Sequence, residues 1–195
     1  MKTIERPDAV VAPQVSANGA SKVEVKGGRF WGTLRIALGG IFFWAFLDKL
    51  FGLGFTTGRL EDGSIQFLGA DAWINGGSPT AGFLEFGTKG PFAGFFQGLA
   101  GSAWVDWAFM LSLAAIGVAL ILGIGTRLAA IGGIIWMGLM YVSSAIWPEH
   151  HPFIDDHVVY AIALAGIAYV GAGRYFGLGR WWEGTALVKK FPVLK

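Results

Sequence analysis

Three charged side chains interrupt the first long apolar run of this 195-residue chain. Arg35 lies near the start of the run, and Asp48 and Lys49 lie one to two turns before its end. A charge at membrane depth is costly and frequently marks a functional residue. Arg35 is close enough to the start of the run to extend its guanidinium to the membrane–water interface. Asp48 is either a proton-exchanging group or a structural residue that bonds a neighbouring helix or the following loop, and the sequence leaves both interpretations open.

A second polar cluster spans residues 149–157 and contains all three histidines of the chain. The spacing of its His, Asp and Glu residues matches no compact ligand motif, so we expect no metal site. Only His157 approaches an apolar run, which leaves no pair of facing axial ligands for haem. A histidine beside a carboxylate can exchange protons near neutral pH, and His157 is a candidate for that role with Asp48. Its alternative role is a hydrogen bond to Asp155 or to the backbone at a helix start.

The composition indicates that lipid surrounds the elements that carry these residues. Hydrophobic residues make up 54% of the chain and charged residues only 14%, unlike a water-soluble domain. The net charge of +2 comes without a basic stripe interleaved with aromatic residues, so we expect no nucleic-acid partner. Because the chain has no cysteine, it can form no disulfide, thiol nucleophile or thiolate metal site.

Four apolar runs are long enough to cross a bilayer, which takes about 20 helical residues. Their backbone groups must be paired within each segment, so the runs are predicted to be helices. Short connections make consecutive helices antiparallel neighbours. The predicted fold is therefore all-α, an integral membrane four-helix antiparallel bundle over residues 30–176, with spans at Phe30 to Phe51, Val105 to Gly125, Leu128 to Trp147 and His157 to Phe176.

The distribution of Lys and Arg predicts the orientation of the chain. Most of these residues precede the first span, follow the fourth, or lie in the tight turn at Arg127, and such residues favour the cytoplasmic side. Residues 1–29, with scattered Pro, Gly and charge, are expected to form a disordered cytoplasmic tail. Residues 177–195 are expected to form a cytoplasmic C-terminal tail.

The long connection over about residues 52–104 is predicted to lie at the outer face. Its many Phe and Leu residues argue against a disordered loop. The spacing of Phe92, Phe95, Phe96 and Leu99 is typical of one face of a short helix. We expect short interfacial helices here that cap the bundle at the outer leaflet.

A family resemblance is carried by several segments: the runs 34–39, 44–50, 73–80 and 123–127, the pair Asp156-His157, and Gly173-Arg174-Tyr175 with Gly177-Leu178-Gly179. Together these segments resemble the DoxX/DoxD family over most of residues 30–190. Members with an assigned role include the membrane subunit of thiosulfate:quinone oxidoreductase. The resemblance implies a subunit in a prokaryotic plasma membrane that has a quinone as its substrate and a protein partner in a redox or respiratory complex.

With this resemblance, Asp48 and His157 are the expected catalytic pair. The expected contacts to quinone or to an anionic sulfur substrate are Trp44, Lys49, Lys89 and Asp156. Electrons are expected to pass directly between bound substrates or through a partner, since thiolate chemistry is excluded. The alternative is a non-catalytic accessory subunit of a larger redox complex, in which Asp48 and His157 only brace the bundle. A transporter is a third possibility, although four helices with few buried charges suit alternating access poorly.

Overall fold

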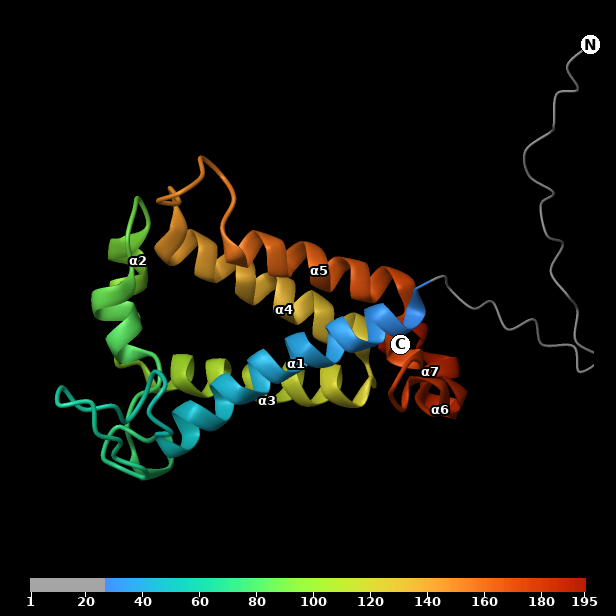
Figure 1. Ribbon diagram of the computed structural model, residues 1–195, viewed down its shortest axis with the longest axis horizontal. Helices are drawn as coiled ribbons and strands as arrows, with labels where there is room; N and C mark the ends of the chain where they lie inside the picture. The colour runs from blue at the N-terminus through green and yellow to red at the C-terminus, as the bar shows by residue number, and fades with distance from the viewer. Residues whose placement is uncertain (1–26) are drawn as a thin grey trace, which may run out of the picture.

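The protein is built from helices throughout the part of the chain that the structure, a computed structural model, describes. That part is residues 27–195, and it contains no β-strand (Figure 1). The long helices are α1 (Gly28–Phe51), α3 (Ala103–Leu122), α4 (Thr126–Met140) and α5 (Asp156–Val170); the short ones are α2 (Ala93–Gln97), α6 (Gly179–Gly184) and α7 (Ala186–Lys190). Single turns of 3-10 helix lie at Trp73–Asn75, Ala172–Arg174 and Pro192–Leu194, and single π-helical turns lie at Phe83–Gly87 and Tyr141–Ala145. The prediction of an all-α fold is confirmed.

Within residues 27–195, three helices are long and apolar enough to span a membrane, one fewer than predicted. They are α1, α3 and the continuous helical stretch Thr126–Ser144 formed by α4 and the π turn after it. The fourth predicted span is shorter than expected, because α5 has 15 residues and ends at Gly171. Gly171 has a φ of 63°, a left-handed conformation that glycine adopts readily and that terminates helices. Residues 172–174 then form a 3-10 turn rather than a continuation of the span.

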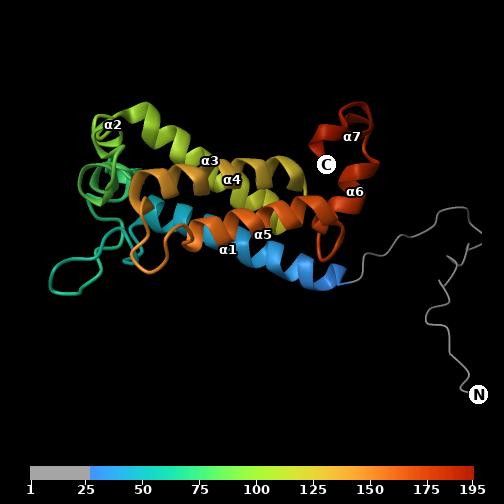
Figure 2. The ribbon, with the colours of Figure 1, turned by 90° about the horizontal axis from the view of Figure 1, so that it is seen from above.

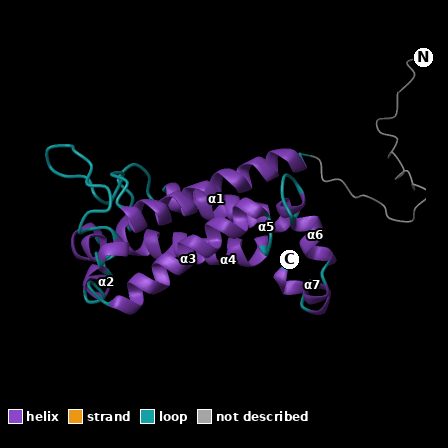
Figure 3. Cartoon of the chain, turned by 90° about the horizontal axis from the view of Figure 1, so that it is seen from below, coloured by secondary structure: helices purple, strands orange, loops and turns teal. Residues whose placement is uncertain are grey.

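The four long helices lie side by side, and each packs mainly on two of the others. Helix α1 packs on α3 and α5, and α4 packs on α3 and α5. Consecutive long helices run in opposite directions (Figure 1). The segment from the end of α1 to the start of α3 therefore lies at one end of the helices with the turn between α4 and α5, and α6 and α7 lie at the other end, where α1 begins (Figures 2 and 3).

Small residues allow α1 and α3 to approach closely. A Cβ atom on Gly39 would lie 2.9 Å from the backbone nitrogen of Ile121, and one on Gly117 would lie 2.7 Å from that of Phe43. Such contacts promote helix association where lipid removes the usual hydrophobic driving force. The buried core between the helices includes Leu38, Phe42, Phe109, Met110, Leu113, Ile116, Leu120, Leu164 and Ile167.

The outward faces of the long helices are apolar as well. Leu111, Ile131, Ile135 and Ile162 are each exposed, and Ile162 retains 67% of its accessible surface. A helix that is hydrophobic on all sides belongs in a large core or in lipid. Combined with the three spans, this surface indicates a protein embedded in a bilayer.

Arg35 does not extend to the interface, which corrects the expectation from sequence. Its side chain is fully buried, and its guanidinium donates to the carbonyls of Leu120 and Ile121 at the end of α3. It also donates to the carbonyls of Tyr175 and Phe176, at 2.9 and 3.2 Å. The last carbonyls of a helix lack partners within that helix, so a planar group with five donors suits this position. Arg35 therefore joins α1, α3 and the segment after α5.

Both ends of the described part of the chain are helical. Residues 1–26 of the expected disordered tail lie outside the described residues, and Gly28 and Arg29 already belong to α1. The expected C-terminal tail over 177–195 forms α6 and α7 followed by a 3-10 turn. The indole nitrogen of Trp182 donates to the carbonyl of Leu194 at 2.6 Å, which folds this segment back on itself.

Candidate functional site

A largely apolar cavity of about 450 Å³ lies between α1, α3, α4 and the long connection. This volume is within the usual range for sites that bind small organic ligands. Aromatic and aliphatic side chains form most of its wall, and only four of the lining residues carry a polar side chain. The lining residues are Lys49, Thr56, Pro79, Thr80, Phe83, Leu84, Phe95, Phe96, Leu99, Trp104, Val105, Ala108, Phe109, Trp136, Leu139, Met140 and Ser143.

The charged group of the cavity is Lys49, in the last turn of α1. Its ammonium donates to the hydroxyl of Thr56 at 2.9 Å and lies 5.9 Å from the centre of the Phe109 ring. A cation over an aromatic face is stabilised by the ring quadrupole. An ammonium carries three donors, and Thr56 is the only hydrogen-bond partner it has within residues 27–195. Donors therefore remain for a ligand carbonyl or anion.

Asp48 holds the turn that carries Thr56. Its side chain is 1% exposed and accepts hydrogen bonds from the backbone nitrogens of Phe55 and Thr56, at 3.0 and 2.9 Å. It also accepts a hydrogen bond of 2.6 Å from the Thr56 hydroxyl. Three donors directed at one carboxylate favour its ionised form, which is a pure acceptor. Asp48 thus bonds the following loop, as its structural interpretation expected, and it connects to Lys49 through Thr56.

Asp106 supports the cavity wall, a role that the sequence analysis did not identify. It lies in the first turn of α3 and is 7% exposed, yet it caps no amide of its own helix. Its Oδ1 instead accepts hydrogen bonds from the hydroxyl of Ser78, at 2.9 Å, and from the hydroxyl and backbone nitrogen of Thr80, at 2.6 and 3.3 Å. These bonds hold the segment that places Pro79 and Thr80 on the cavity wall. The signal available in the sequence was a carboxylate at the start of an apolar helix together with the Ser-Pro-Thr run in the loop.

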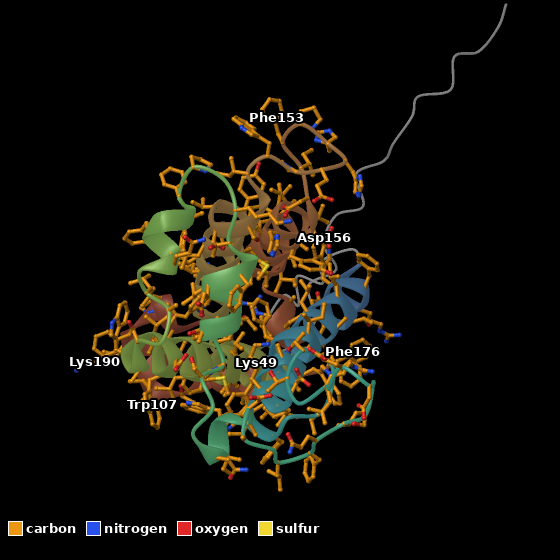
Figure 4. All side chains as sticks on the ribbon, turned by 90° about the vertical axis from the view of Figure 1, so that its left-hand side faces the viewer. Lys49, Trp107, Phe153, Asp156, Phe176 and Lys190 are labelled. Carbon is orange, nitrogen blue, oxygen red and sulfur yellow. The ribbon has the colours of Figure 1, made fainter. Side chains whose placement is uncertain are left out.

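His157 lies apart from the Asp48 group. Its Nδ1 is 2.6 Å from Oδ2 of Asp155, and it does not line the cavity. Asp155 also caps α5 by accepting a hydrogen bond from the backbone nitrogen of Val158. Figure 4 looks onto this end of the helices and shows Lys49 and the exposed Asp156 well separated across it. The structure therefore does not bring the expected pair, Asp48 and His157, together.

The other two expected contact residues lie outside the cavity lining. Trp44 is 46% exposed and stands edge-on to the Phe55 ring, with 5.2 Å between ring centres. The Lys89 ammonium lies 3.9 Å from a carboxylate oxygen of Glu149, and both side chains are mostly exposed. Of the six expected site residues, only Lys49 faces the cavity directly.

The histidine-rich segment forms local hydrogen bonds. The Nδ1 atom of His151 accepts from the backbone nitrogens of Phe153 and Ile154, at 3.1 and 2.9 Å. Among residues 27–195, no group of three or more His, Asp or Glu side chains is arranged to hold a metal ion.

The arrangement can hold an amphiphile that has a flat apolar body and one polar end. Apolar walls bury the body, and Lys49 supplies a charged donor for a carbonyl oxygen. Phe95 and Trp104 line the cavity yet are 69% and 66% exposed, so the wall is continuous with the apolar exterior. Comparison of the chain with family models, curated proteins and solved structures found no match.

Proposed function

We propose that this chain is a quinone-binding membrane subunit of an oxidoreductase, of the DoxX/DoxD type that its sequence resembles. The observation that supports this best is the apolar cavity with a single ammonium, Lys49, at its polar end. A quinone ring is flat and apolar and carries carbonyl oxygens at its edge. Lys49 donates to one of these oxygens, and the aromatic wall around Phe109 covers the ring.

In this proposal four helices cross the membrane, with α5 as a short fourth span that packs on α1 and α4. Exposed cations gather at the end where α6 and α7 lie, at Arg29, Arg127, Arg174, Arg180 and Lys189. In this proposal that end and both termini face the cytoplasm of a prokaryotic cell, which agrees with the preference of cationic residues for the inner side of a membrane. The long connection and the cavity then lie near the outer leaflet, where quinone enters past Phe95 and Trp104.

The proposed reaction couples a sulfur donor to the quinone. Two thiosulfate ions join through a new sulfur–sulfur bond and release two electrons, and the quinone takes up these electrons with two protons to become a quinol. Lys49 is the proton-bearing group nearest to the ring, and Thr56 connects it to Asp48. His157, paired with Asp155, serves proton exchange only if the ligand extends beyond the cavity.

A second candidate is a non-catalytic accessory subunit of a redox complex. It is favoured by the bonding of Asp48, whose two oxygens both accept hydrogen bonds from residues of the connection that follows α1. In this case the cavity holds a quinone or lipid without turnover. Stable retention of cytochrome-containing subunits after mild detergent extraction, with no activity of the chain alone, would favour this candidate.

Quinone binding is tested with the purified full chain in detergent, by titration with a short-chain ubiquinone analogue followed by calorimetry. Lys49→Met removes the charged donor and keeps the length of the side chain. It should weaken binding by about tenfold or more, since a hydrogen bond to a charged group contributes roughly 1.5–3 kcal/mol. Lys189→Met, an exposed position on α7, is the matched control and should bind as the unaltered chain does.

The result that contradicts the proposal is equal affinity of the Lys49→Met and unaltered chains. Turnover is assayed separately, as thiosulfate-dependent quinone reduction in membranes. Loss of turnover in Asp48→Asn but not in His157→Ala would limit proton exchange to the Lys49 end of the cavity. Loss of turnover in both variants would show that His157 also takes part in proton exchange.

A further inference from the structure

A second pocket lies at the opposite end of the helices and is lined by arginine. It is an open hollow of about 490 Å³ whose wall comes from the start of α1, the segment after α5 and the first turn of α6. Six residues line it, and none is acidic: Arg29, Arg174, Tyr175, Phe176, Gly177 and Arg180. Three arginines from three separate elements therefore line one hollow.

Close backbone packing holds these elements in place. The ring of Tyr175 lies over Gly28, where a Cβ atom would come within 2.0 Å of it. The carbonyls of Tyr175 and Phe176 accept hydrogen bonds from the buried Arg35. The backbone nitrogen of Leu178 donates to the carbonyl of Leu122 at 2.8 Å, which ties the segment to the end of α3. These contacts fix the backbone of the segments that carry the arginines.

The positive charge of the hollow is only partly compensated within the described residues. Arg174 forms an ion pair with Glu183, with 2.8 Å between Nη2 and Oε2. Hydrogen bonding to that carboxylate raises the pKa of Arg174. Arg29 and Arg180 have no acidic partner within residues 27–195. Two guanidinium groups therefore remain for an anion.

The start of α1 adds to this positive field. Its N-cap, Gly27, provides no side-chain hydrogen bond, and its first turn contains no acidic residue. Instead Arg29 occupies that turn, where the positive end of the helix dipole disfavours a cation. An anion beside Arg29 would reduce the repulsion between its positive charge and the helix dipole.

Large exposed apolar side chains lie in the elements that form the hollow and indicate its depth in the membrane. Phe30, Phe176 and Trp181 are each at least 60% exposed, and they lie in or beside the elements that form the wall. Aromatic side chains that are exposed next to cations are typical of the headgroup level of a bilayer. The anion available at that level is the phosphate of a lipid.

We infer that this arginine pocket binds the phosphate of an anionic phospholipid headgroup in the inner leaflet. Arg29 and Arg180 contact the phosphate oxygens, for which the planar guanidinium fork is well suited. Arg174 contributes its remaining charge while Glu183 orients it. Basic pockets on the cytoplasmic side of membrane helices bind such headgroups. The inference is independent of quinone binding at the other end of the helices.

The test is native mass spectrometry of the full chain, released from vesicles of phosphatidylcholine with a minor fraction of phosphatidylglycerol. The unaltered chain should retain phosphatidylglycerol selectively. Arg29→Gln and Arg180→Gln should each reduce retention by about fivefold, and the double variant by more, as expected for one cation near an anionic membrane surface. Arg127→Gln removes an exposed arginine at the same end that does not line the pocket, and it should retain the lipid normally.

Three outcomes would overturn the inference. Equal retention by the double variant and the unaltered chain would show that the lipid binds elsewhere. An equal loss in Arg127→Gln would show a diffuse effect of surface charge. The third outcome concerns the chain in phosphatidylcholine vesicles. If inorganic phosphate raises the unfolding temperature of the protein there as much as phosphatidylglycerol does, the ligand is a free anion. The helical circular dichroism signal and the gel-filtration profile of each variant serve as the folding control, since variants that match the unaltered chain in both have kept the helix packing.

Discussion

The hydroxyl of Thr56 donates a hydrogen bond of 2.6 Å to the carboxylate of Asp48, eight residues earlier in the chain. The same hydroxyl oxygen accepts a hydrogen bond of 2.9 Å from Lys49. A neutral residue in the loop thereby links two charged neighbours that point in different directions on α1. This link fixes the Lys49 ammonium at the end of the apolar cavity.

Thr56→Val should therefore destabilise the protein by about 2 kcal/mol, because a charged carboxylate and an ammonium both lose a partner. The change is measured as the free energy of unfolding in detergent, from the helical circular dichroism signal. Thr57→Val is the control, since the Thr57 side chain makes no hydrogen bond within the described residues. Equal effects of the two substitutions would show that the Thr56 link contributes nothing specific.

Arg35→Lys keeps the charge in the core but should lower the free energy of unfolding by about 2–3 kcal/mol. A lysine ammonium cannot reproduce the planar fork that serves carbonyls of both α3 and residues 175–176, and a buried carbonyl without a donor costs roughly 1–3 kcal/mol. Arg127→Lys, at an exposed position, should be neutral in the same denaturation experiment. A neutral result for Arg35→Lys would contradict the view that these four bonds hold the segment after α5.

Asp106→Ala should release the segment that forms one wall of the cavity. The substitution removes the acceptor of three hydrogen bonds from Ser78 and Thr80. Faster amide hydrogen exchange over residues 76–82 is the expected readout, with α3 itself remaining protected. Asp156→Ala, an exposed acid in the first turn of α5, should leave this exchange unchanged. Unaltered protection in Asp106→Ala would mean that packing alone holds the loop.

Two glycines of the same short helix should respond in opposite ways to alanine. A Cβ atom at Gly179 would lie 2.4 Å from the backbone of Gly173, so Gly179→Ala should cost about 1–3 kcal/mol. At Gly184 nothing lies within 4 Å, and Gly184→Ala should be neutral or slightly stabilising. Thermal unfolding of the two variants side by side checks this contrast. A stable Gly179→Ala chain would show that α6 can shift away from residues 173–177 without loss.

Much of the helical framework could be predicted from the apolar runs. An apolar segment of sufficient length must pair its own backbone groups in lipid, so its type and approximate bounds follow from composition. The spacing of Phe92, Phe95, Phe96 and Leu99 likewise predicted a short helix, and α2 forms there. The length of α5 was predicted wrongly. Several of these helices contain glycine in their interior, so hydropathy alone does not show that Gly171 terminates α5.

The candidate site depended on contacts between residues far apart in the chain. Their place within an apolar run identified Lys49 and Asp48 as unusual charges. The run did not predict that Phe109 and Thr56 would contact Lys49. Asp106 bonds residues 26 and 28 positions earlier, and Arg35 reaches carbonyls 85 to 141 positions later. Such pairings depend on the path of the long connection and on the close approach of helices at small residues. Local residue patterns determine helices, whereas the partners of a buried charge are determined only when the helices pack.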